Sequence, residues 1–120
     1  MDSRKKVLVI DDDASIRDVL KDYLQEHGFE VMLAADGLEG LDMIKQGGHD
    51  ILILDIRMPY VSGIGLLKII KQHSPDTPVI CMTGYGESPE KIAEQERVDV
   101  ILSKPFDLQD LLQEIQKRLA

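Results

Sequence analysis

Residues 51–63 read ILILDIRMPYVSG, and this stretch decides the class of fold. Four consecutive apolar residues without polar alternation favour a strand buried on both faces, as in a parallel sheet. Met58-Pro59 and Gly63 then interrupt regular structure and predict a loop. Asp55 is therefore expected at the carboxyl end of a central strand, which is where open α/β sheets bind their ligands.

Apolar runs of the same kind occur at four other places, and each of the five runs is followed by a helical pattern or a helix start signal. We predict strands over Lys6–Ile10, Val31–Ala35, Asp50–Leu54, Val79–Met82 and Val98–Leu102. The helices are expected to begin after Asp13, at Asp36, near Ile64, after Ser88 and after Asp107. Strands that alternate with helices imply right-handed crossovers and a parallel sheet covered on both faces. The sequence therefore predicts a single α/β domain over residues 1–120.

Each helix is predicted to bury one apolar face, and Gly28 is expected to end the first helix. The buried faces are expected to contain Ile16, Val19, Leu20, Tyr23 and Leu24 in the first helix, Leu38, Leu41 and Ile44 in the second, Leu66, Leu67 and Ile70 in the third, and Leu108, Leu111, Leu112, Ile115 and Leu119 in the last. Residues 89–96 contain few apolar side chains, and we expect their helix to be the most mobile part of the fold.

The composition excludes several classes of partner. The chain has 22 acidic and 14 basic residues and a formal net charge of −8, which disfavours non-specific binding to nucleic acid or anionic membrane. The single cysteine, Cys81, rules out an internal disulfide, fits a reducing compartment and is expected to be a buried, inert thiol. No apolar stretch approaches membrane-spanning length, and the N-terminus lacks a signal-peptide core. We expect a cytoplasmic protein.

Polar side chains stand at the ends of four predicted strands: Asp11 and Asp12 after the first, Asp55 after the third, Thr83 after the fourth and Lys104 after the fifth. In a parallel sheet these ends meet at one edge. Three carboxylates close together repel one another unless a cation lies between them, and ligands that are all oxygen suit Mg²⁺. A lysine and a hydroxyl nearby can hold phosphoryl oxygens, and an aspartate can act as the nucleophile. The pattern predicts phosphoryl transfer onto Asp55.

These motifs resemble those of receiver domains of two-component response regulators, including the chemotaxis-type single-domain regulators. The acidic pair Asp11-Asp12 follows the first strand, and residues 55–63 match the family's D-x-x-M-P-x-x-x-G loop. Thr83-Gly84 matches the family's hydroxyl and small residue, and residues 104–106 match its K-P-F signature. The resemblance covers the whole chain. It implies a flavodoxin-like (βα)5 doubly wound fold whose five-stranded parallel sheet has the order 2-1-3-4-5.

The resemblance also implies roles for the acidic residues. Asp55 would accept a phosphoryl group from the phosphohistidine of a histidine kinase. Asp12 and Asp55 would bind Mg²⁺ directly together with the backbone carbonyl of Arg57, and Asp11 would contribute through water.

Lys104 and Thr83 would carry the response. The resemblance implies that Lys104 contacts Asp55 at rest and a phosphoryl oxygen afterwards, while Thr83 turns toward the phosphoryl group and moves the loop that follows it. The family usually has an aromatic residue three positions before the lysine, but this chain has Ile101 there. Isoleucine has no polar tip and a stiff χ1 angle, so the usual rotamer coupling is not expected, although Tyr85 is an alternative.

The expected partners follow from the same resemblance. A sensor histidine kinase or phosphotransfer protein would donate the phosphoryl group. The face formed by the fourth strand and helix and the fifth strand and helix would signal to a downstream protein or to an output domain missing from this chain. The protein would be a monomer or a phosphorylation-dependent dimer, and it would not be an enzyme acting on other substrates.

Three other functions fit the residues less well. An aspartyl-phosphate phosphatase of the haloacid-dehalogenase type needs a second aspartate two positions after the nucleophile, where this chain has Arg57. A flavodoxin-like electron carrier needs a phosphate loop after the first strand, where residues 11–13 are acidic. A receiver-like module that is never phosphorylated is disfavoured by the complete set of five site residues.

Overall fold

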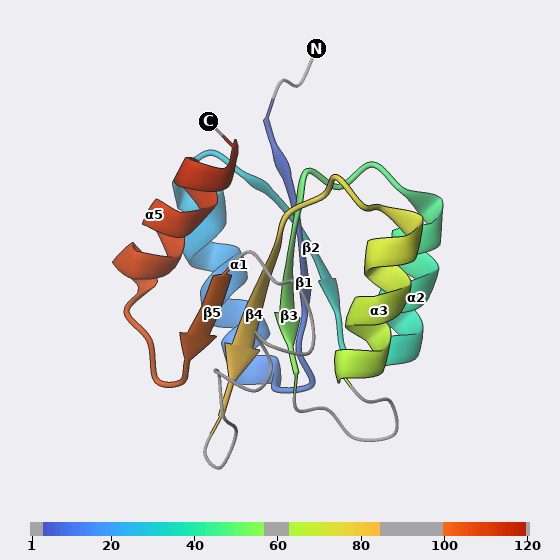
Figure 1. Ribbon diagram of the computed structural model, residues 1–120. Coiled ribbons are helices and arrows are strands. Elements are labelled where there is room, and N and C mark those ends of the chain that lie inside the picture. The colour runs from blue at the N-terminus through green and yellow to red at the C-terminus, as the bar shows by residue number, and fades with distance from the viewer. Residues whose placement is uncertain (1–3, 57–62, 85–99, 120) are drawn as a thin grey trace.

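The computed structural model describes residues 4–56, 63–84 and 100–119, which contain one five-stranded parallel sheet and helices on both of its faces (Figure 1). The strands are β1 (Lys6–Ile10), β2 (Glu30–Ala34), β3 (Ile51–Asp55), β4 (Val79–Thr83) and β5 (Val100–Ser103). The helices are α1 (Ala14–Glu26), α2 (Gly37–Gln46), α3 (Gly63–His73) and α5 (Leu108–Leu119). The strand order β2-β1-β3-β4-β5 confirms the predicted fold.

The register of the parallel strands brings their carboxyl ends to one edge of the sheet. Ile10 pairs with Leu54, Asp55 with Met82, and Thr83 with Ser103. The arrowheads in Figure 1 point the same way, toward the edge away from both chain termini. Polar residues that are far apart in the sequence are therefore gathered at this edge.

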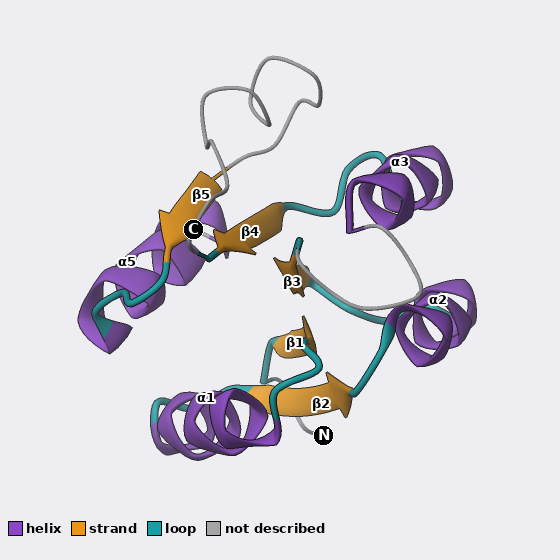
Figure 2. Ribbon diagram, turned by 90° about the horizontal axis from the view of Figure 1, so that it is seen from below, coloured by secondary structure: helices purple, strands orange, loops and turns teal. Residues whose placement is uncertain are grey.

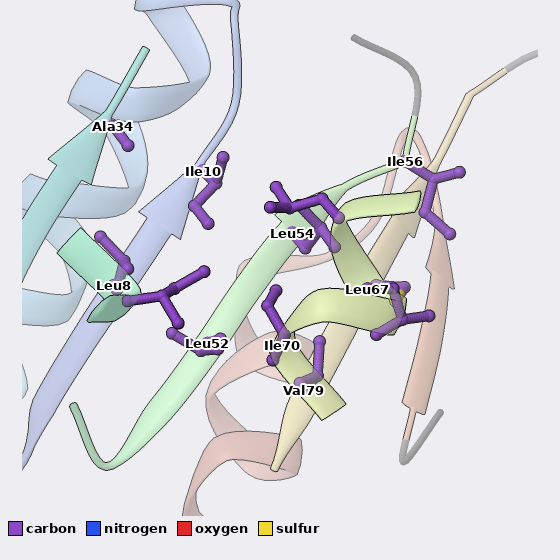
Figure 3. Close-up of a cluster of buried hydrophobic side chains, with 12 residues drawn as sticks. Leu8, Ile10, Ala34, Leu52, Leu54, Ile56, Leu67, Ile70 and Val79 are labelled. Atoms are coloured by element: carbon purple, nitrogen blue, oxygen red, sulfur yellow. The ribbon is translucent and has the colours of Figure 1, made fainter. Parts of the chain in front are cut away.

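Two apolar clusters, one on each face, hold the helices to the sheet. Helices α1 and α5 lie on one side and α2 and α3 on the other (Figure 2). On the α2/α3 side, Leu8 and Ile10 from β1 meet Leu52 and Leu54 from β3 and Ile70 from α3 (Figure 3). The strand β3 is buried along its whole length, as its uninterrupted apolar run predicts.

The predicted caps and turns are confirmed where the structure describes them. Asp13 accepts hydrogen bonds from the backbone N–H groups of Ser15 (2.8 Å) and Ile16 (3.3 Å) at the start of α1. Asp36 accepts one from the N–H of Glu39 at 2.8 Å. Gly28 follows α1 with φ of 90°, a conformation that glycine adopts without the steric cost other residues incur. The caps place the first turn of α1 directly beside the end of β1.

Two predicted core residues are not in the core. Val19 is 50% exposed and Leu38 is 67% exposed. Both lie at the border of an apolar helical stripe, where a small rotation of the helix decides between core and solvent. Cys81, in contrast, is fully buried as predicted.

The predicted strand boundaries shift by one or two residues. The second strand begins at Glu30, the third ends on Asp55, and the fifth runs to Ser103. Strand ends are set by hydrogen bonds to the neighbouring strand, which the apolar pattern does not encode. The helix predicted over 89–96 lies outside the described residues. No helix in the described parts of the chain is long and apolar enough to cross a membrane.

Candidate functional site: an acidic pocket at the carboxyl edge of the sheet

The sheet brings together the predicted site residues that the structure describes. Asp11 follows β1, Asp55 ends β3, Thr83 ends β4 and Lys104 follows β5. Asp11 is fully buried, Asp55 is 4% exposed and Thr83 is 1% exposed. Asp12, in contrast, is exposed. Polar side chains buried to this degree need partners, and Lys104 supplies one to both Asp11 and Asp55.

The three carboxylates form one cluster. One oxygen atom from each of Asp11, Asp12 and Asp55 lies within 4.8 Å of the others. Hard oxygen ligands at this spacing, with one of the three acids open to solvent, suit an ion such as Mg²⁺ that keeps several of its waters. The donor set therefore fits the predicted ion. Arg57, whose carbonyl was predicted as a further ligand, lies outside the described residues, as do Met58 and Pro59.

Lys104 joins the two buried carboxylates. Its Nζ donates to Asp11 Oδ2 at 3.0 Å and to Asp55 Oδ2 at 3.3 Å. The predicted contact of Lys104 with Asp55 is thus confirmed, and the contact with Asp11 is the shorter of the two. One ammonium group between two carboxylates offsets part of their mutual repulsion.

The surroundings of Lys104 act on its pKa in opposite directions. Partial burial of the ammonium group lowers the pKa, since burial disfavours the charged form. The hydrogen bonds and negative charges of Asp11 and Asp55 together outweigh this effect, so the pKa lies above the usual 10.5. Lys104 is therefore a cation at neutral pH, and its ammonium group can bind oxyanions.

Asp11 has a structural role that sequence reasoning missed. Its Oδ1 accepts the backbone N–H of Asp13 at 2.9 Å, while its Oδ2 accepts Lys104. Its own backbone carbonyl accepts a hydrogen bond of 2.7 Å from the guanidinium of Arg17 in α1. These bonds fix the turn between β1 and α1 and so fix where Asp12 is presented. The sequence signal for this role is the position of Asp11 directly after a buried strand.

The fourth and fifth strands hold Thr83 and Lys104 in fixed positions relative to each other. The backbone N–H of Lys104 donates to the carbonyl of Thr83 at 2.7 Å. The hydroxyl of Thr83 donates to the hydroxyl of Ser103, with 3.4 Å between the oxygens. Ser103 was not singled out from the sequence. The signal that finds it is the register of the sheet, which pairs Thr83 with Ser103.

An apolar hollow of about 510 Å³ lies beside the acidic pocket. It is lined by Ile16 and Val19 of α1 and by Pro105 and Phe106 after β5, and Lys104 belongs to the same lining. Its volume lies within the range of roughly 300–1,000 Å³ that is usual for ligand pockets in proteins.

Comparisons with known proteins agree with this fold and site. Residues 7–116 match the profile of the response regulator receiver domain. The response regulator MprA of Mycobacterium avium is 36% identical over 108 residues, which are 89% of this chain and 47% of that protein. The chain thus spans about half the length of the curated relatives it matches.

Solved structures of response regulator proteins superpose on nearly the whole of this chain. A CheY-like response regulator receiver domain protein from Methanospirillum hungatei superposes with a TM-score of 0.91 at 34% identity, over 98% of this chain and 94% of the other. The response regulator TrrA of Thermotoga maritima, solved in complex with Mg²⁺-BeF, has a TM-score of 0.87 at 34% identity, over 96% and 99% of the two chains. This chain belongs to the response regulator receiver domain family of two-component systems.

The charge cluster leads to a first prediction, which concerns stability without metal. Asp55→Asn removes the repulsion of Asp55 with two carboxylates together with its ion pair with Lys104, and Lys104 keeps its shorter contact with Asp11. In the absence of Mg²⁺, we expect the free energy of unfolding of the variant to exceed that of the unaltered protein by about 1 kcal/mol. Urea unfolding in EDTA measures this. Asp42→Asn, the same change at an exposed position of α2, should leave stability unchanged. An unchanged or less stable Asp55→Asn would contradict the prediction.

Proposed function

We propose that this chain is a phosphoacceptor switch, which takes a phosphoryl group onto Asp55 from the phosphohistidine of a histidine kinase or phosphotransfer protein. The observation that carries the proposal is the nearly buried Asp55 carboxylate, grouped with two other carboxylates and hydrogen-bonded to Lys104 at 3.3 Å. Such a group of acids is costly for a fold, and its arrangement suits a site that stabilises a transferring phosphoryl group.

In the proposed transfer, a carboxylate oxygen of Asp55 attacks the phosphorus of the donor. The P–N bond of the phosphohistidine breaks, its electron pair stays on the imidazole nitrogen, and an acyl phosphate forms on Asp55. Lys104 exchanges its contact with Asp55 for one with a phosphoryl oxygen. The hydroxyl group of Thr83 donates a hydrogen bond to another phosphoryl oxygen. Both contacts are charge-assisted, and such hydrogen bonds are roughly twice as strong as those between neutral groups.

Asp12 and Asp55 would hold Mg²⁺ directly, with the carbonyl of Arg57, and Asp11 would assist through water. When bound, the ion neutralises charge on the phosphoryl oxygens. Asp11 also keeps Lys104 and the turn before α1 in place through the hydrogen bonds of its two carboxylate oxygens. The exposure of Asp12 leaves one side of the cluster open to solvent, and so to the ion and its waters.

The proposed product is a signal rather than a metabolite. The domain over residues 1–120 would catalyse only its own phosphorylation and dephosphorylation. The modified state would be read by a downstream protein or by an output domain, through the face around β4 and β5 and the helices that follow them. We further propose a cytoplasmic location, no direct contact with nucleic acid or membrane, and a monomer that forms dimers at most on phosphorylation.

The second prediction tests this function directly. Incubation with acetyl phosphate and Mg²⁺ is expected to add one phosphoryl group, because a small donor can reach a carboxylate at the open edge of the sheet. Intact-mass spectrometry measures the addition. With EDTA in place of Mg²⁺, only a small fraction of the protein should be modified. If the mass is unchanged with Mg²⁺ present, the proposed function is wrong.

A further inference from the structure

The hydroxyl group of Thr83 can donate only one hydrogen bond at a time. Thr83 is 1% exposed, so its hydroxyl has little access to water and depends on partners within the fold. A threonine hydroxyl has one proton to donate, and in this structure the proton goes to the hydroxyl of Ser103. A phosphoryl oxygen can only accept. Thr83 must therefore release Ser103 before it can donate to a phosphoryl group on Asp55.

The strand register makes Ser103 the polar group directly opposite Thr83. β4 and β5 run parallel, with Thr83 paired to Ser103 and Cys81 paired to Ile101. Side chains alternate along a strand, so Ile101 and Ser103 project to the same face of β5. Ile101 packs against the apolar cluster on the α2/α3 side of the sheet and offers no hydrogen bond. On this face of β5, the side chain that forms a hydrogen bond with Thr83 is therefore that of Ser103.

The bond between the two hydroxyls is weak enough to exchange. Its length of 3.4 Å exceeds the usual spacing of hydroxyl pairs, which is about 2.7–2.8 Å. Ser103 is exposed, so water competes for it. A charged phosphoryl oxygen forms a shorter and stronger bond. The contact therefore favours the unmodified arrangement by a small amount without preventing the switch.

We propose that Ser103 is a positioning residue for the switch: it accepts the hydroxyl proton of Thr83 in the unmodified protein and thereby sets how readily Thr83 turns to the phosphoryl group. The proposal rests on the proposed function. It gives β5 a polar connection to Thr83 at a position other than the one held by Ile101. Removal of the Ser103 hydroxyl should leave the buried proton of Thr83 without this acceptor, so that binding of a phosphoryl group becomes more favourable.

The third prediction tests this with Mg²⁺ and beryllofluoride, which occupies an aspartate as a phosphoryl group does. Ser103→Ala is expected to lower the dissociation constant of beryllofluoride by about two- to fivefold, since a weak hydrogen bond no longer has to be broken. Ser103→Thr, which keeps the hydroxyl, should restore the value of the unaltered protein. Calorimetric titration measures each constant.

A double-mutant cycle separates this role from a general effect on the strand. In a Thr83→Ala background, Ser103→Ala should no longer change beryllofluoride binding, because the hydroxyl that it releases is absent. Ser74→Ala, a serine at the opposite edge of the sheet after α3, should change binding in neither background.

Each outcome decides the proposal. Tighter binding in Ser103→Ala that disappears in the Thr83→Ala background supports it. Unchanged or weaker binding in Ser103→Ala overturns it, as does an effect of equal size in both backgrounds, and in these cases the proposed function stands. If the unaltered protein neither binds beryllofluoride nor accepts a phosphoryl group from acetyl phosphate, the proposed function fails, and this inference fails with it.

Discussion

Asp55→Asn is expected to abolish phosphorylation by acetyl phosphate, with no phosphoryl group detected by intact mass under conditions that modify the unaltered protein fully. The amide lacks the negative charge that makes the carboxylate a nucleophile. Asp11 cannot substitute for it, because it is fully buried and both of its carboxylate oxygens already accept hydrogen bonds.

The matched control for this fourth prediction is Asp42→Asn, at an exposed position of α2, which should be modified like the unaltered protein. Persistent modification of Asp55→Asn would show that another residue accepts the phosphoryl group. Combined with the stability measurement above, the variant is expected to be more stable without metal and yet inactive. A variant that was both inactive and unstable would point to misfolding instead of a lost nucleophile.

Lys104→Met is expected to lower the free energy of unfolding by about 2–3 kcal/mol in the absence of metal. The substitution removes the ammonium group that contacts Asp11 at 3.0 Å and Asp55 at 3.3 Å, and so leaves buried carboxylates that repel one another. The lysine side chain is 22% exposed, which keeps the expected loss below that of a fully buried pair. A decrease of the melting temperature by about 10 °C would correspond to it.

Mg²⁺ and pH provide two further readouts of this fifth prediction. Mg²⁺ should raise the melting temperature of Lys104→Met more than that of the unaltered protein, because the ion supplies the missing positive charge. The pKa of Lys104 is raised above 10.5 in the folded state, so its contribution is fully present below that pH and is lost as the pH rises through the folded-state value.

The stability difference between Lys104→Met and the unaltered protein should therefore be constant near neutral pH and shrink above about pH 10.5. Lys45→Met, which removes an exposed lysine of α2, is the control for removal of one positive charge. A difference that grows with alkaline pH, or an equal loss of stability in Lys45→Met, would contradict the role assigned to the ion pair.

The hydrophobic pattern was sufficient to predict the five strands, their parallel arrangement and the edge at which the site lies. Uninterrupted apolar runs such as residues 51–54 belong to strands covered on both faces, and the acids and the lysine at their ends then had to meet. Caps were predictable for a similar reason, because Asp13 and Asp36 satisfy N–H groups within three residues of themselves.

The border residues Val19 and Leu38 were not predictable in this way. An apolar side chain at the margin of a helical stripe is buried or exposed according to the rotation of the whole helix, and that rotation depends on packing against distant strands. The ends of β3 and β5 likewise depend on hydrogen bonds to neighbouring strands.

By itself, the sequence determined which residues gather at the site, because each follows a buried apolar run and such runs are encoded locally. Only the tertiary structure decided how those residues are paired. It joined Lys104 more closely to Asp11 than to Asp55, and it placed the exposed hydroxyl of Ser103 against the buried one of Thr83. The physical reason is that these pairings depend on the register and spacing of strands far apart in the chain, which no local pattern specifies.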